Sequence, residues 1–298
     1  MKSIITLKSK LVKRGPIFAL LPALLVVIFI LVPFGYSIYF SLTDASLIEK
    51  DIHFIGFGNY IKYFGSGLFW HNFKVTFSYT FLAMFFEFLL GFIIAFALNQ
   101  DTWLGRFLRP FTLFPLMISP IIGTIMWKLM MNPEFSVLNF ILSPFGVAKD
   151  FSWSADTDYA LFSAVLIDVW MFTPFIAIII LAGLKGMPPR VIEATRVDGL
   201  SRFTILRKIV FPLLMPYIVI CLVFRFIDSI AQFDIIFGLT RGGPGDTLMV
   251  YQVEAYTQVF NYYKIGYGSA IMLVMWLIVF IVCNFLIRYW NSLRERLR

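Results

Sequence analysis

The chain has 298 residues, of which 60% are hydrophobic, 18% aromatic and 14% charged, whereas soluble domains carry about 25% charged residues. This composition excludes a disordered chain, a disulfide scaffold and a large water-soluble catalytic domain. The net charge of +8 would suit nucleic-acid binding if the basic residues formed a patch, but they gather at the ends of apolar runs.

Six apolar runs follow along the chain, each long enough to cross about 30 Å of hydrocarbon as a helix. The first contains no charged residue from Pro16 to Phe40, which exceeds the ~7–15 residue core of a signal peptide, so we expect it to be retained. The predicted spans cover residues 16–40, 73–98, 107–131, 159–184, 210–236 and 264–288. The sequence therefore predicts an all-α membrane protein with six transmembrane helices.

The Lys and Arg residues outside these spans concentrate on one side of the predicted membrane. They fall mainly in residues 1–15, the 99–109 turn, the 185–209 loop and residues 289–298. The positive-inside rule therefore predicts that both termini and the 185–209 loop are cytoplasmic. We expect a basic N-terminus (1–15), a first helix (16–40), a transmembrane core (73–288) containing the 185–209 loop, and a basic C-terminus (289–298). Topology explains the positive charge, so we expect contact with the lipid bilayer and no nucleic acid.

The loop between the fourth and fifth predicted spans is longer than a simple turn requires. Pro188 and Pro189 suit the first turn of a short helix, and Gly199 suits its end. Ser201 is placed to cap a second short helix that runs into the fifth span. Periodicity alone leaves three interpretations open: a helix lying on anionic lipid, a solvated basic linker, or a docking element for a cytoplasmic partner.

Residue spacing in this loop resembles that of a known family. Glu193-Ala194-Thr195, three residues, Gly199, nine residues, Ile209, one residue and Phe211-Pro212 are similar to the EAA loop of permease subunits of binding-protein-dependent ABC importers. Thr195 stands where a second Ala is usual, and Phe211 where Leu is usual. Segments that resemble the carbohydrate-uptake branch are Gly15-Pro16 to Leu24, Phe57-Gly58-Asn59-Tyr60, Asn132-Pro133-Glu134-Phe135 and Leu239 to Gly245.

The likeness covers essentially the whole chain and is strongest to the first permease of maltose, trehalose or multiple-sugar systems. It implies a type I importer fold whose coupling helix contacts an ATPase through Glu193, Ala194, Thr195, Asp198 and Gly199. The implied partners are a second permease in a heterodimer, two cytoplasmic ATPase subunits and an extracytoplasmic sugar-binding protein, in a bacterial or archaeal cytoplasmic membrane. Because no phosphate loop occurs in the chain, we expect ATP and Mg on the partner subunits and no cofactor here.

An ionisable residue inside a membrane span costs free energy, so each such residue is a functional candidate. Arg225, Asp228, Ser229 and Gln232 recur at i, i+3, i+4 and i+7, which predicts one polar helical face. The resemblance places Arg225, Ser229 and Gln232 at positions that line the sugar site, with Asp228 beside them, and brings Phe172 and Phe175 to it. For Arg225 and Asp228 the alternative is an ion pair between the two side chains. For Phe172 and Phe175 the alternative is simple aromatic packing.

Other residues in the spans carry weaker signals. Glu87 and Asp168 are interpreted either as path residues or as interhelical hydrogen-bond partners. Gly91 and Ala95 form a small-residue pair that would allow close helix packing. The expected substrate is an oligosaccharide or polyol, and Arg225 leaves an acidic sugar open.

Two other classes of protein compete with this interpretation. An enzyme is disfavoured because His53 and His71 belong to no metal-binding helix, and no serine-nucleophile elbow occurs; we expect no catalytic residue and no metal. Cys221 and Cys283 lie in apolar runs, so no disulfide is expected. An ATP-independent carrier or channel fits six spans and a polar stripe, but it needs no ATPase-docking loop.

Overall fold

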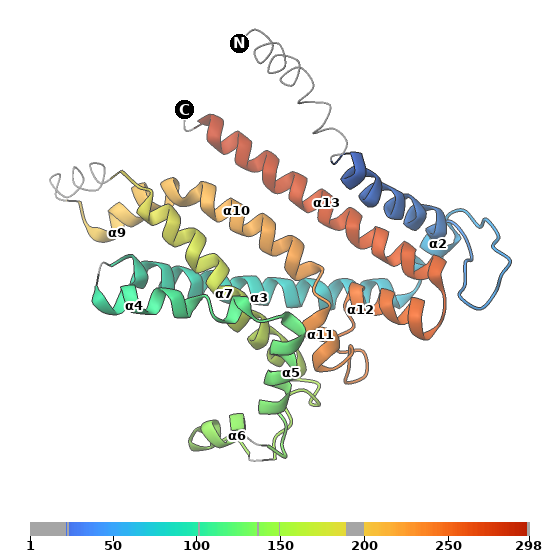
Figure 1. Cartoon of the computed structure of the whole chain (residues 1–298), viewed down its shortest axis with the longest axis horizontal. Coiled ribbons are helices and arrows are strands. Elements are labelled where there is room, and N and C mark those ends of the chain that lie inside the picture. Colours follow the sequence, from blue (N-terminus) through green and yellow to red (C-terminus); the bar gives the residue numbers. More distant parts are fainter. Residues whose placement is uncertain are drawn as a thin grey trace, which may run out of the picture.

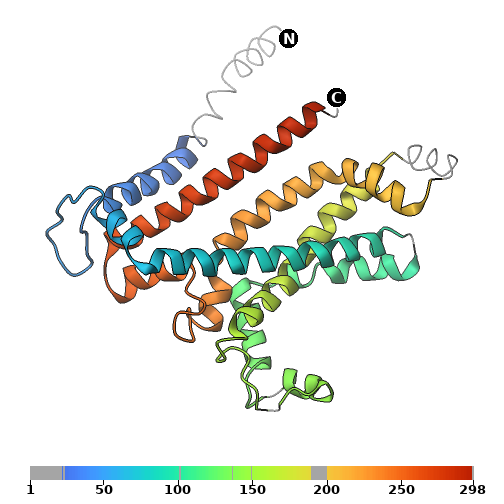
Figure 2. The same cartoon turned by 180° about the vertical axis from the view of Figure 1, so that it is seen from behind.

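The computed structural model describes residues 22, 24–100, 102–135, 137–148, 150–188 and 200–296, and Figures 1 and 2 show them from opposite sides. Five helices in this part of the chain are long and apolar enough to cross a membrane. They are Leu24–Ser41, α3 (Gly67–Asn99), α7 (Ala160–Lys185), Arg202–Ile230 and Ile265–Asn291 within α13 (Ile265–Arg296). The only β pairing in the described residues is an isolated bridge between Thr43 and Phe54. The all-α membrane fold is therefore confirmed.

Shorter helices connect the long ones at the two ends of the bundle. They are α2 (Gly58–Gly65), α4 (Trp103–Thr112), α5 (Pro120–Met130), α6 (Val137–Leu142), α11 (Asp234–Leu239) and α12 (Tyr251–Tyr256). The long 202–230 helix itself contains α9 (Arg202–Ile205) and α10 (Phe211–Ile230). Figure 1 shows α2 and α12 at one end of the long helices, and α9 with the last turns of α13 at the other. The start of the 202–230 helix and the described C-terminal end thus lie toward the same end of the bundle.

The third predicted span, 107–131, is not one straight helix. It is a bent pair, Gly105–Met117 and Pro120–Met130, whose axes meet at 95°. Ile118 (φ −85°, ψ 136°) and Ser119 (φ −59°, ψ 134°) have non-helical backbones, and for Ser119 this is expected because it precedes Pro120. Pro120 then begins α5. The predicted span therefore corresponds to this bent pair, and hydropathy does not register the break within it.

The fifth span begins as expected and ends early. Ser201 caps α9, since its hydroxyl accepts a hydrogen bond of 3.2 Å from the backbone nitrogen of Thr204. A π-helical segment, Leu206–Val210, then leads into α10. The helix stops at Ile230 because Ala231 leaves helical geometry (φ −92°, ψ 14°). The predicted continuation of this helix to residue 236 was therefore wrong.

Close packing holds α3 against α7. A Cβ atom added at Gly91 would lie 2.7 Å from Cβ of Ile176, so only glycine permits this approach. Ala95, one turn later, is fully buried. In lipid, helices associate through such van der Waals contact rather than through the hydrophobic effect. The predicted role of the Gly91–Ala95 pair in close packing is confirmed.

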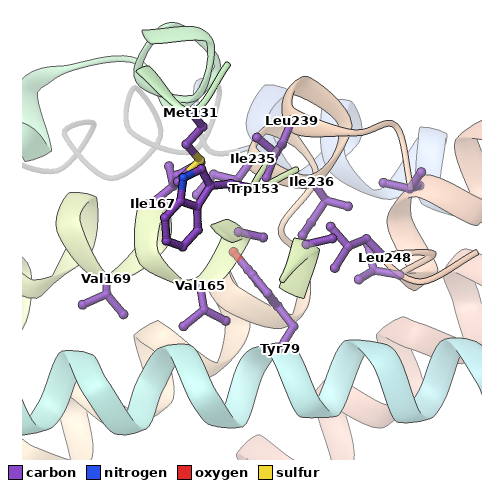
Figure 3. Close-up of a cluster of buried hydrophobic side chains, with 14 residues drawn as sticks. Tyr79, Met131, Trp153, Val165, Ile167, Val169, Ile235, Ile236, Leu239 and Leu248 are labelled. Atoms are coloured by element: carbon purple, nitrogen blue, oxygen red, sulfur yellow. The ribbon is translucent and has the colours of Figure 1, made fainter. Parts of the chain in front are cut away.

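A buried apolar cluster joins α7 to the helices at one end of the bundle. Figure 3 shows Tyr79 extending from α3 toward Val165 of α7 and Ile235 of α11. Trp153, from the loop before α7, joins the same cluster and donates a 2.6 Å hydrogen bond to Oδ1 of Asn139 in α6. The loop between α5 and α7 is therefore anchored to the bundle.

Candidate functional site

Three of the long helices contribute to a network of buried charges. Arg225 of α10 is 1% exposed, and Glu87 of α3 and Asp168 of α7 are fully buried. Arg225 donates from Nε to Oε2 of Glu87 (2.7 Å) and from Nη2 to Oε1 of Glu87 (2.5 Å). The same Nη2 lies 3.1 Å from Oδ2 of Asp168. One guanidinium thus binds carboxylates from two other helices.

The outward-facing member of the network is Asp228, one turn after Arg225. Its Oδ2 accepts a 2.5 Å hydrogen bond from Nη1 of Arg225, and its side chain is 57% exposed. The ring of Phe172 lies 4.2 Å from the guanidinium carbon, in cation–π geometry. Gln232 donates a long 3.5 Å hydrogen bond to Oδ1 of Asp168. Arg225 is therefore held on every polar edge by acceptors.

Burial makes this network energetically demanding. Removing a carboxylate or a guanidinium from water costs several kcal/mol per ion, and only close pairing with further hydrogen bonds offsets it. The bidentate Arg225–Glu87 pair supplies that geometry. Because Glu87, Asp168 and Arg225 come from three different helices, the network fixes how α3, α7 and α10 are rotated relative to one another.

A cavity of about 280 Å³ opens beside the network. Its lining is mainly apolar and aromatic, with Arg225 and Asp228 as its charged residues. The lining residues are Leu116, Phe172, Phe175, Phe224, Arg225, Ile227 and Asp228. Phe175 packs edge-on against Phe224, with ring centroids 6.5 Å apart. An aromatic wall beside a polar group is the arrangement that suits the apolar face and the hydroxyls of a sugar ring.

The expected polar stripe is only partly one face. Arg225 and Asp228 reach the cavity, but Ser229 is 1% exposed, and its hydroxyl has no hydrogen-bond partner among the described residues. Gln232 follows the end of α10 and turns inward to Asp168. The prediction of a single continuous helical face was therefore wrong, because the helix ends at Ile230.

The structure resolves two alternatives that the sequence left open. The Arg225–Asp228 ion pair exists, and it coexists with exposure of Asp228 to the cavity. Glu87 and Asp168 are interhelical partners of Arg225. Phe224 and Leu116, which also line the cavity, carried no distinguishing signal in a chain with 35 Phe residues.

The predicted ATPase-contacting residues cannot be placed on this fold. The residues are Glu193, Ala194, Thr195, Asp198 and Gly199. All of them lie outside the described residues, which stop at 188 and resume at 200.

A second polar cluster lies outside the spanning helices, at the α2–α12 end. Glu254 of α12 is 4% exposed and accepts a 2.7 Å hydrogen bond from Nε2 of Gln258. Burial raises the pKa of Glu254, and the carboxylate of Asp246 adds to the increase, whereas Gln258 and His71 oppose it. His71 also contacts the backbone oxygen of Asp246 at 2.6 Å. These contacts attach the start of α3 to the turn after α11.

That turn contains the glycine-rich segment Gly242-Gly243-Pro244-Gly245. Arg241, Gly242 and Gly245 have positive φ values of 57°, 96° and 57°, as tight reversals require. The oxygen of Gly242 accepts a hydrogen bond from the nitrogen of Leu248. The segment is therefore a tight turn.

The chain is a helical bundle with several candidate membrane spans and a charge network between three of its long helices, which places it in the class of multi-pass membrane proteins. A family model described as "Binding-protein-dependent transport system inner membrane component" matches residues 87–296. The chain belongs to this family.

Relatives in the same family cover most of the chain. A probable ABC transporter permease protein, y4oQ of Sinorhizobium fredii, is 37% identical over 84% of this chain and 82% of its own. The trehalose/maltose transport system permease protein MalF of Thermococcus litoralis is 34% identical over 92% of both chains. The trehalose transport system permease protein SugA of Mycobacterium tuberculosis is 30% identical over 95% of this chain and 91% of its own.

Solved structures agree on the fold. A chain of a bacterial alginate ABC transporter in complex with an alginate pentasaccharide-bound periplasmic protein has a TM-score of 0.79. It is 18% identical, and the match covers 93% of this chain and 94% of that one. A chain of the MetNI methionine ABC transporter has a TM-score of 0.55 at 19% identity, over 76% of this chain and 97% of that chain. The ABC importer permease fold is therefore confirmed.

Proposed function

We propose that this chain is one of two permease subunits of an ATP-driven importer that takes up an oligosaccharide or polyol by alternating access. The observation that carries the proposal is the aromatic-walled cavity beside the Arg225 network, inside a bundle of the transport-component family. Relatives named as trehalose/maltose and trehalose permeases support a sugar as the substrate class.

In this proposal the cavity forms part of the translocation path. Phe172 and Phe175 stack on the apolar face of a sugar ring, and the free oxygen of Asp228 accepts a hydrogen bond from a hydroxyl. Ser229 and Gln232, which are buried in this structure, join the path when the helices rearrange during gating. Arg225 acts by positioning Asp228 and by holding the three helices together.

The remaining parts of the importer follow from the family. The 193–199 segment, with Glu193, Ala194, Thr195, Asp198 and Gly199, couples the chain to two cytoplasmic ATPase subunits that carry ATP and Mg. A second, distinct permease completes the path, and an extracytoplasmic sugar-binding protein delivers the substrate. Both termini are cytoplasmic, and the membrane is the cytoplasmic membrane of a bacterium or archaeon. The chain itself breaks no bond and holds no cofactor.

An ATP-independent carrier or channel is the competing function. Membership of the binding-protein-dependent family favours the importer. The two functions make opposite predictions for transport when no ATPase subunit is present.

The test is sugar uptake and sugar-stimulated ATP hydrolysis by the complete importer in lipid vesicles, compared with the chain alone. Glu193→Ala combined with Gly199→Asp should abolish both activities, whereas the exposed loop variant Glu134→Ala serves as the matched control. Uptake by the chain alone, unaffected by the double substitution, would favour the autonomous carrier.

A further inference from the structure

Arg225 lines the cavity, but carboxylates accept hydrogen bonds from Nε, Nη1 and Nη2 of its guanidinium. Its Nε donates to Glu87, its Nη2 to Glu87 and Asp168, and its Nη1 to Asp228. The guanidinium is itself 2% exposed. One cation is thus enclosed by three carboxyl groups, two of them fully buried.

Asp228 carries the unbalanced charge to the surface of the cavity. Its Oδ2 binds Arg225, while its Oδ1 has no hydrogen-bond partner among the described residues. The side chain is 57% exposed, and the other lining side chains apart from Arg225 are apolar. A ligand entering this cavity therefore meets a carboxylate oxygen as its first charged group.

We propose that Asp228 makes this half of the path select against anionic ligands, so that neutral glycosides and amino sugars pass in preference to uronates and sugar phosphates. This inference rests on the proposed function, and it removes the acidic sugar that the sequence alone left open. Asp228 is the specificity-determining residue, and Arg225 is a positioning residue behind it.

The sign of the charge does not depend on the ionisation of one buried acid. With Glu87, Asp168 and Asp228 all ionised, the network carries an excess of two negative charges. If one of the buried carboxyls holds a proton, an excess of one negative charge remains. If both buried carboxyls hold protons, the net charge of the network is zero, but the exposed Asp228 carboxylate still faces the cavity while the Arg225 guanidinium lies enclosed behind it. Charges within several ångströms in a medium of low dielectric interact by more than thermal energy, so the group nearest the ligand repels anions.

The direct test measures the local potential with charged thiol reagents and needs no knowledge of the substrate. Ile227 lines the cavity and is 42% exposed, so Ile227→Cys provides a reporter thiol. The native thiols, Cys221 and Cys283, are buried and are replaced by Ala. The complete importer in lipid nanodiscs is treated with cationic or anionic methanethiosulfonate reagents, and labelling of this chain is followed by mass spectrometry.

Both reagents attack the same thiolate, so the ratio of their rates cancels any change in thiol ionisation. The quantity compared is the rate with the cationic reagent divided by the rate with the anionic reagent. We expect this ratio at Ile227→Cys to exceed the ratio for 2-mercaptoethanol at least about tenfold. Asp228→Asn should lower this preference at least about threefold, and Asp228→Glu should retain it. An unchanged ratio in Asp228→Asn, a preference for the anionic reagent, or failure of both reagents to react would overturn the inference.

A second measurement separates this inference from the proposed function. Uptake of trehalose, trehalosamine and trehalose 6-phosphate by the complete importer is compared, each normalised to its affinity for the isolated binding protein. Wild type should discriminate against the phosphate, and Asp228→Asn should weaken that discrimination. Equal normalised uptake of the phosphate would overturn the inference alone. Absence of ATP-dependent uptake of these three sugars and of every other oligosaccharide or polyol that the binding protein binds, with the thiol ratio as expected, would instead overturn the proposed function.

Discussion

Arg225 and Glu87 are 138 residues apart in the sequence, yet they form a bidentate pair with hydrogen bonds of 2.7 Å and 2.5 Å in the interior of the bundle. The pair connects α10 to α3, and Asp168 extends it to α7. Because an unpaired charge is far more costly in this interior than at a surface, the pair makes the arrangement of three helices depend on one guanidinium.

Arg225→Met should destabilise the bundle by about 3–5 kcal/mol, because two buried carboxylates lose their partner. The measurement is the midpoint of thermal unfolding in detergent, followed by tryptophan fluorescence. Arg288→Met, at an exposed position of α13, is the matched control and should change the midpoint little. The double variant Arg225→Met, Glu87→Met should lose less stability than the sum of its single substitutions. Additive losses would contradict the pairing.

Gly91→Ala should destabilise the packing of α3 on α7 by about 1–3 kcal/mol, the usual cost of overpacking. The added Cβ would lie 2.7 Å from both Cβ and Cγ2 of Ile176, so the two helices must separate. Gly35→Ala is the control, because no atom lies within 4 Å of the position of its Cβ. Equal unfolding temperatures for the two variants would rule out the close contact.

Ser201→Ala should cost about 1 kcal/mol, and Ser201→Gly only a few tenths, because alanine removes a helix cap that glycine partly replaces. The native hydroxyl accepts from the nitrogen of Thr204 at 3.2 Å. Ser201→Asp should match or exceed wild type, since its carboxylate both caps the helix and faces its positive end. Chemical unfolding of the purified chain orders the three variants, and a ranking with Ala above Asp would refute the cap.

Glu254→Gln should flatten the dependence of stability on pH. Burial raises the pKa of Glu254 in the folded protein, so the stability linked to this group is fully present below its unfolded pKa of about 4.3 and is lost as pH rises through the folded value. The variant keeps an acceptor for Gln258 and avoids the buried charge. Its unfolding temperature should therefore exceed that of wild type at pH 8 and match it at pH 4.

The exposed acid variant Glu134→Gln serves as the control for general charge effects. If wild type and Glu254→Gln lose stability in parallel from pH 4 to pH 8, then Glu254 does not titrate in the way its burial implies.

Much of the architecture was readable from local sequence patterns. The predicted spans 73–98, 159–184 and 264–288 fall within α3, α7 and α13 apart from one terminal residue at Tyr159 and one at Lys264. Ser201 caps a helix as predicted, and Gly91 permits the close contact expected of a small residue. The spans depend on hydropathy over a helix length and the cap depends on a bond within one turn, and both are properties of contiguous sequence.

Tertiary structure decided what these elements do together. Average hydropathy over a helix length did not reveal the 95° bend at Ile118 and Ser119 or the end of α10 at Ile230, because apolar runs lie on both sides of each break. The partners of Arg225 depended on how three helices cross and rotate, since Glu87 and Asp168 lie 138 and 57 residues away from it. The sequence by itself determined that charged groups lie within the bundle and must be paired there. Only the fold decided that Arg225 is enclosed and that Asp228 faces the cavity, because exposure is set by the neighbouring helices.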